Sequence, residues 1–135
     1  MTRDRLARGV LAADGLGCAT AAGVVLGSER VVASFDPSLR VRWPLAMALG
    51  ATSALLVAGA IHKQPTNRVL ERAAAVNAGW VTACLVGLLL RRPSGSGIAL
   101  LATTAVLDGA AAIAQLAVRS DSEKRESDVP YPCNM

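Results

Sequence analysis

Four polar residues stand within otherwise apolar stretches of this 135-residue sequence, and their side chains are the ones that could do chemistry. They are two acids and two carboxamides: Asp14, Asn77, Asp108 and Gln115. A carboxyl group in apolar surroundings can bind and release a proton, and a carboxamide can donate a hydrogen bond to it or accept one from it. On a helix, Asp108 and Gln115 would share a face with Thr104. We therefore predict that the four residues form one buried polar cluster.

Four long stretches with few charges surround these residues and predict the elements that hold them. They cover about residues 9–27, 43–61, 69–90 and 98–118, each close to the ~20 residues that a helix needs to cross a bilayer. Glu71 and Arg72, near the start of the third stretch, are expected at the lipid headgroups. Core helices of a soluble protein would instead carry charged outer faces, which these stretches lack. We predict an all-α fold, a four-helix transmembrane bundle with short loops and an intramembrane polar cluster.

The composition fits a membrane domain followed by a polar tail. Hydrophobic residues make up 53% of the chain and charged residues only 18%, whereas soluble domains contain about 25% charged residues. Residues 1–118 are expected to form the four-span membrane domain. Residues 119–135 mix both charges with Pro130 and Pro132 and are expected to form a disordered cytosolic tail.

Lys and Arg are distributed unevenly between the two sides of the predicted bundle. With the N-terminus inside, the inner side holds nine of them: Arg3, Arg5, Arg8, Lys63, Arg68, Arg72, Arg119, Lys124 and Arg125. The outer side then holds five: Arg30, Arg40, Arg42, Arg91 and Arg92. Since cytoplasmic segments carry the excess of these residues, we expect a multi-pass protein of the cell membrane with both termini in the cytoplasm.

The N-terminal stretch has a second interpretation as a signal peptide. Its arginines could form the basic start of one, and Ala19-Thr20-Ala21 resembles a cleavage site. Asp14 argues against this interpretation, because it interrupts the apolar segment that a signal peptide needs.

Small residues recur every four positions along the predicted helices and indicate close helix packing in lipid. The stripes are Gly15, Ala19, Gly23 and Gly27; Ala46, Gly50, Ala54 and Ala58; Ala75, Gly79, Ala83 and Gly87; and Ala105 with Gly109. These stripes could pair within one chain or between chains. The expected partners are therefore the lipid bilayer and either further copies of the chain, in a homo-oligomer, or the other proteins of a larger membrane complex.

The span from about Arg8 to Arg119 resembles the small four-span integral membrane proteins of high-GC Gram-positive bacteria. The matching features are an Arg-bearing entry followed by Asp14, the run Val76-Asn77-Ala78-Gly79-Trp80-Val81, and Gln115 before the basic exit at Arg119. The resemblance implies the four-span topology and no assigned activity. The sequence departs from that family in its second acid, Asp108, and in its few aromatic residues.

A second resemblance is to the small multidrug resistance transporters, which are short, four-span and proton-coupled through a carboxylate in their first helix. Asp14 is similar in position to that carboxylate. Those proteins use Glu and line their drug site with aromatic residues, whereas Trp80 is the aromatic residue expected inside this bundle.

Several functional classes find no support in the sequence. It contains no phosphate-binding loop, nucleophile elbow, HExxH motif or paired CxxC motifs, and one His with three scattered Cys supplies no metal site. We expect no enzyme activity, no cofactor and no nucleic-acid partner. We expect a structural or assembly component of the membrane, and the alternative is a small proton-coupled transporter that uses Asp14 or Asp108.

Overall fold

The computed structural model describes residues 3–62, 67–91 and 93–127, and these ranges contain helices and no strand. The four long helices are α1 (Arg3–Gly27), α3 (Arg42–Ile61), α4 (Asn67–Leu90) and α5 (Gly95–Ser127), and the short helix α2 (Glu29–Ala33) lies between α1 and α3. Each long helix includes a segment that is long and apolar enough to cross a membrane. The predicted all-α fold with four long apolar helices is therefore confirmed.

Two of the helices extend beyond the apolar stretches that predicted them. α1 begins at Arg3 rather than near residue 9, and α5 continues to Ser127 rather than ending near residue 118. Both extensions lack Gly and Pro, and they are rich in charged residues that favour helix, Arg in the first and Arg, Lys and Glu in the second. Residues 119–127 thus continue α5 instead of beginning the expected disordered tail, and the rest of that tail lies outside the described residues.

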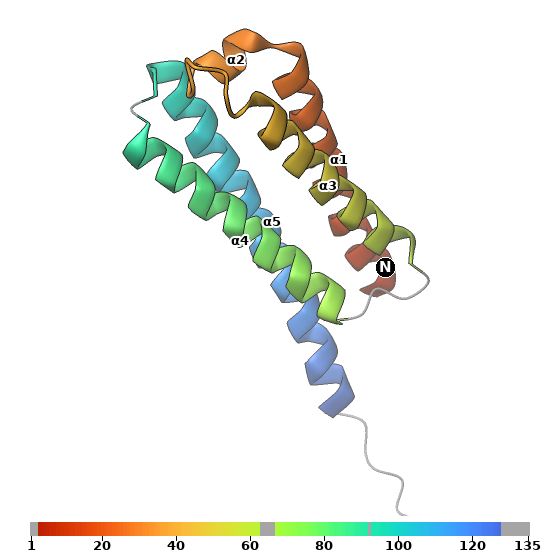
Figure 1. Cartoon of the computed structure of the whole chain (residues 1–135). Helices are drawn as coiled ribbons and strands as arrows, with labels where there is room; N and C mark the ends of the chain where they lie inside the picture. Colours follow the sequence, from red (N-terminus) through yellow and green to blue (C-terminus); the bar gives the residue numbers. More distant parts are fainter. Residues whose placement is uncertain (1–2, 63–66, 92, 128–135) are drawn as a thin grey trace, which may run out of the picture.

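The long helices form two antiparallel hairpins, α1 with α3 and α4 with α5 (Figure 1). The hairpins meet mainly through α1 and α5. α1 begins and α5 ends at the same end of the bundle, which we call the terminal end, and α2 lies at the opposite end (Figure 1). The connection from α4 to α5 lies at the α2 end as well.

Polar side chains make the turn between α1 and α3. The Ser28 hydroxyl accepts a hydrogen bond from the Val31 amide (3.4 Å) and so caps α2. Arg42, at the start of α3, donates to the carbonyl oxygens of Val25 (3.3 Å) and Leu26 at the end of α1. It also pairs with Glu29 at 2.8 Å. Two of the last carbonyls of α1, which have no partner in their own helix, are thereby satisfied.

Buried apolar residues form two separate clusters. The one toward the terminal end draws on α1, α3 and α4 and contains Ala7, Leu11, Cys18, Leu56, Ala60, Leu70 and Ala73. The smaller one lies beneath α2 within the first hairpin and contains Val25, Val32 and Ala46. The two hairpins therefore share an apolar core only toward the terminal end.

The stripes of small residues are only partly used inside the chain. A Cβ added at Gly15 would lie 2.9 Å from Cγ2 of Val57 and 3.4 Å from the Ser53 carbonyl oxygen, so the close approach of α1 to α3 needs glycine there. A Cβ added at other stripe glycines would meet no neighbouring atom within 4 Å: Gly23, Gly27, Gly50 and Gly79. Much of the small-residue surface of α1, α3 and α4 therefore faces outward.

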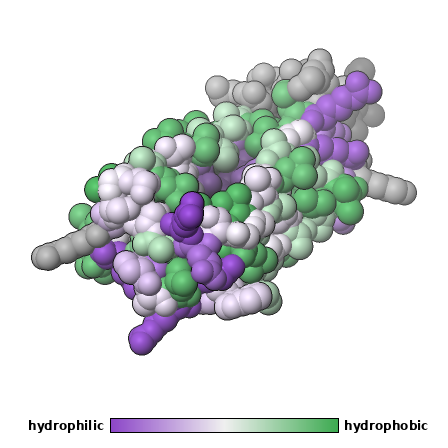
Figure 2. All heavy atoms as spheres, turned by 90° about the horizontal axis from the view of Figure 1, so that it is seen from above, coloured by the Kyte–Doolittle hydropathy of each residue, from purple (hydrophilic) through white to green (hydrophobic). Residues whose placement is uncertain are grey.

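The outer surface of the bundle is apolar along its length. Large side chains with exposed fractions of 64–80% point outward from all four long helices, among them Leu16, Met47, Leu89 and Ile113. In Figure 2 most hydrophilic residues gather toward the two ends, and hydrophobic or weakly polar residues cover the surface between them. This distribution is compatible with a protein surrounded by lipid.

Candidate functional site

Three of the four predicted polar residues meet between the two hairpins. The Nδ2 amide of Asn77 on α4 donates to Oδ2 of Asp14 on α1 at 2.6 Å and to Oε1 of Gln115 on α5 at 3.3 Å. The Nε2 amide of Gln115 donates to the same oxygen of Asp14 at 2.8 Å. We call these three residues the polar triad. It joins a helix of the first hairpin to both helices of the second.

The polar triad is largely shielded from the surroundings of the protein. Asn77 and Gln115 are completely buried, and Asp14 is half-buried. Oδ1 of Asn77 is also buried and accepts no hydrogen bond from any residue in the described ranges. A buried acceptor without a donor costs about 1–3 kcal/mol. This carbonyl oxygen could therefore bind one further donor.

Asp108, the fourth predicted residue, stands apart from the triad. It precedes Gln115 by two helical turns, about 10 Å along α5. Its half-buried carboxyl group accepts no hydrogen bond within the part of the chain that the structure describes, but it is close enough to Asp14 for their charges to interact. The structure thus places three of the four residues in one hydrogen-bonded group and the second acid nearer the middle of the bundle.

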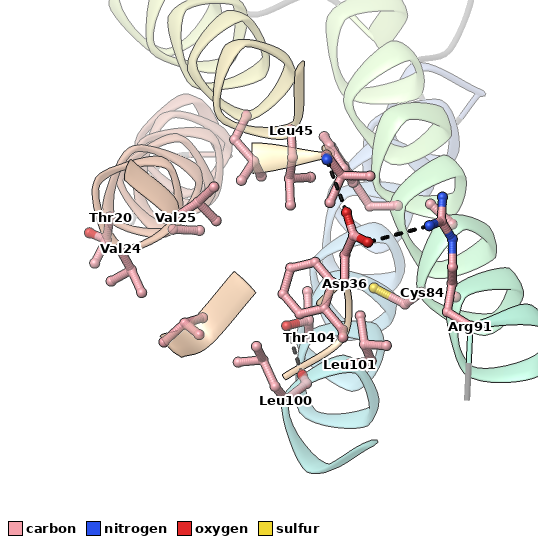
Figure 3. A pocket seen from close by; sticks show the side chains of 18 of the residues that line it. Thr20, Val24, Val25, Asp36, Leu45, Cys84, Arg91, Leu100, Leu101 and Thr104 are labelled. Carbon is pink, nitrogen blue, oxygen red and sulfur yellow. Dashed lines mark hydrogen bonds and ion pairs between the residues drawn. The ribbon is translucent and has the colours of Figure 1, made fainter. Parts of the chain in front are cut away.

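A cavity of about 600 Å³ lies between the hairpins on the α2 side of the triad (Figure 3). Its lining is mainly apolar and comes from all four long helices and the α2 turn. Three residues form its inner end: Gly17, Trp80 and Thr104. They lie one helical turn from Asp14, Asn77 and Asp108 respectively, on the same helices. The cavity therefore ends one turn away from both Asp14 and Asp108.

At the α2 end, the turn that follows α2 contacts the connection between α4 and α5 and so links the two hairpins. The amide and the hydroxyl of Ser94 both donate to the carbonyl oxygen of Ser34, each at 3.0 Å. Nη1 of Arg91 lies 3.5 Å from Oδ1 of Asp36 (Figure 3). We call these four residues the turn clasp. Polar contacts thus join the hairpins at the triad and at the clasp, with the cavity between.

Asp36 is nearly completely buried and organises the turn that carries it. Its carboxylate accepts hydrogen bonds from the hydroxyl of Ser38 (2.6 Å) and from the backbone amides of Ser38 (3.3 Å) and Val41 (3.1 Å). The Ser38 hydroxyl, followed by the Val41 amide, holds the pKa of Asp36 below its ordinary value of 3.8, and the positive charge of Arg91 acts in the same direction. The carboxyl group is therefore ionised at neutral pH and attracts Arg91.

The turn clasp is the part of this site that the sequence analysis missed. The run Asp36-Pro37-Ser38 does carry a signal, because an Asp before such a pair often bonds to the backbone two residues later. That signal predicts the turn but not its contact with the second hairpin.

Other residues that could carry chemistry have simpler surroundings. The indole of Trp80 lines the cavity and makes no hydrogen bond with any described residue. Cys18 and Cys84 are buried free thiols, and His62 is exposed at the end of α3. In the described ranges, no three His, Cys, Asp or Glu residues are placed to hold a metal ion.

Comparisons with known proteins add no assignment to this geometry. No family model, no curated protein and no solved structure matches the chain. The likeness to small four-span bacterial proteins stays a prediction.

Proposed function

We propose that this chain is a multi-pass integral membrane protein of the cell membrane, with α1, α3, α4 and α5 as its spans and both termini in the cytoplasm. The four long apolar helices support it, together with the large apolar side chains that the fold leaves exposed along its sides. The orientation is supported by the excess of Lys and Arg at the terminal end.

Within the membrane, the role we propose is that of a structural or assembly component without enzyme activity. The observation that carries this role is the outward position of the stripe glycines Gly23, Gly27, Gly50 and Gly79. In lipid, close backbone approach between helices is a main source of association, and glycine permits it. A second copy of the chain or another membrane protein could pack against these faces, while the polar triad keeps the two hairpins in one arrangement.

Two matched substitutions on α1 test the proposed assembly role. The affinity-tagged chain is isolated from native membranes in mild detergent, and bound proteins are identified by mass spectrometry. Gly23→Leu should release the bound partner and leave the melting temperature unchanged, because position 23 faces outward. Gly15→Leu should lower the melting temperature, because its side chain would collide with α3. A wild-type chain isolated alone, as a monomer, would contradict the assembly role.

A proton-coupled transporter is the second candidate function. The specific observation in its favour is the cavity that ends one helical turn from Asp14 and Asp108. A carboxyl group that bound a proton and a substrate in turn would need such access. Proteoliposomes with a pH-sensitive dye inside test it. Proton flux that disappears in Asp14→Asn or Asp108→Asn would support transport, and equal flux in both variants and in empty liposomes would exclude proton coupling.

A further inference from the structure

The cavity between the hairpins is lined mainly by apolar side chains, so water would not fill it favourably. Its volume of about 600 Å³ is in the range of small-molecule sites. Most of its lining side chains are aliphatic, such as Val24, Leu45 and Leu101. Water would find few hydrogen-bond partners there, and unfilled space would deprive the lining of dispersion contacts. The cavity is also only partly enclosed, so in a bilayer its open side would meet acyl chains.

Arg91 stands at the rim of this cavity, where the proposed membrane spans would place it at the depth of the lipid headgroups. Arg91 lines the cavity and directly follows the last residue of α4. Its side chain is 55% exposed, whereas its partner Asp36 is only 4% exposed. The ion pair with Asp36 uses one of the two Nη groups, so other N–H donors of the guanidinium remain for a second partner.

The surrounding surface adds positive charge that Asp36 does not cancel. Arg42 is paired with Glu29, while Arg30 and Arg40 form no ion pair with any residue in the described ranges. The α2 end of the bundle therefore carries a net positive charge beside an apolar cavity. An anionic headgroup on an acyl chain has the complementary arrangement.

We propose that this cavity binds one acyl chain of an anionic phospholipid, with the lipid phosphate held by Arg91 at the rim. The chain enters between the hairpins below the turn clasp and reaches the inner end at Gly17, Trp80 and Thr104. The bound lipid fills the space that the two separate apolar clusters leave between the hairpins. This inference rests on the proposed membrane location but on neither the assembly nor the transport role.

The fluorescence of Trp80 can report directly on an acyl chain in the cavity, because Trp80 lies at its inner end. The chain has two tryptophans, so Trp43→Phe leaves Trp80 as its only one. The full chain is reconstituted into vesicles of phosphatidylcholine that contain increasing fractions of acyl-brominated phosphatidylglycerol or, separately, acyl-brominated phosphatidylcholine. Bromine quenches the indole on contact. We expect brominated phosphatidylglycerol to quench Trp80 at a mole fraction about fivefold lower than brominated phosphatidylcholine, as one Arg–headgroup contact predicts.

Two variants, each with a matched control, separate the effect of the headgroup contact from the effect of the cavity. Arg91→Gln should remove the preference for the anionic lipid, and Arg68→Gln, at the terminal end of α4, should keep it. Ala83→Phe should fill the cavity and reduce the quenching by both lipids, whereas Ala78→Phe should not, because Ala83 lines the cavity and Ala78 does not.

Three results would overturn the inference: equal quenching by both lipids, quenching that Ala83→Phe leaves unchanged, or a bound apolar compound other than a phospholipid in mass spectra of the purified protein. Failure of membrane insertion is a separate outcome, because it would also abolish quenching of the exposed Trp43 in the unsubstituted chain.

Discussion

Replacing Asp14 separates the hydrogen-bonding role of its carboxyl group from its charge. Asp14→Ala removes two hydrogen bonds and leaves buried N–H donors on Asn77 and Gln115 without an acceptor. Since interhelical hydrogen bonds in membrane proteins average about 0.6 kcal/mol, we expect the free energy of unfolding to fall by about 1–2 kcal/mol. Asp14→Asn keeps one acceptor oxygen and should lose less than half as much. Unfolding in detergent, followed by circular dichroism, measures both. Equal losses would show that the charge of Asp14 matters more than its hydrogen bonds.

Asp36 should make the free energy of unfolding depend on pH in the acid range. Because its pKa is lower in the folded protein than in the unfolded chain, its contribution is complete above the ordinary value of 3.8 and is lost as the pH falls through the lowered pKa. Asp36→Asn should therefore be less stable than the wild type at pH 7, and the difference should shrink below about pH 4. Melting temperatures across this range test it, with the exposed Asp4→Asn as control. A constant difference at all pH values would contradict the expected linkage.

The residues of the site differ in how far sequence alone could reveal them. Asp14, Asn77 and Gln115 stand out because a polar side chain in an apolar helix needs a partner, and such partners come from other helices at similar depth. Asp36 and Arg91 lie in turns, where charged residues are common and carry no such signal. Their burial and pairing depend on how the hairpins meet, which no local pattern specifies.

At the scale of elements, the start of α5 must lie directly against the α2 turn. A Cβ at Gly97 would collide with the backbone carbonyl of Ser34, which already accepts two hydrogen bonds from Ser94. Backbone cannot move aside as a side chain can, so Gly97→Ala should loosen the turn clasp and lower the melting temperature. Gly95→Ala, where a Cβ meets nothing within 4 Å, should be neutral or slightly stabilising, because Ala favours helix by up to about 1 kcal/mol over Gly. Equal effects of the two substitutions would exclude the clash.

Apolar length predicts the four long helices well, because a bilayer-spanning segment has few alternatives to helix. It does not predict their ends or α2, which depend on local hydrogen bonds such as the Ser28 cap and the Arg42 contacts with α1. Nor can a stripe of small residues show which neighbour it faces. Gly15 packs against α3, whereas Gly23, two turns later on the same helix, faces outward.

At the scale of the whole molecule, the hairpins are two units joined at separated points. The polar triad joins them near the middle of α1 and α4, and the turn clasp joins them at the α2 end, with the apolar cavity between the two. Hydrogen bonds and ion pairs are directional, so these two junctions specify one relative orientation of the hairpins more strictly than the apolar core that the hairpins also share toward the terminal end. The same arrangement suits the proposed assembly role, which needs a fixed outer shape, and the proposed lipid between the hairpins.

The proposed orientation of the whole chain has a direct test by cysteine labelling. The native cysteines are replaced by Ser, and single cysteines are introduced by Pro37→Cys at the α2 end and His62→Cys at the terminal end, both at exposed positions. Neither substitution changes the count of Lys and Arg on which the orientation depends. In intact cells, a membrane-impermeant maleimide should label the cysteine at position 37 and not that at 62, and permeabilised cells should label both. The reverse pattern would place the termini outside, and equal labelling in intact cells would show that both orientations occur.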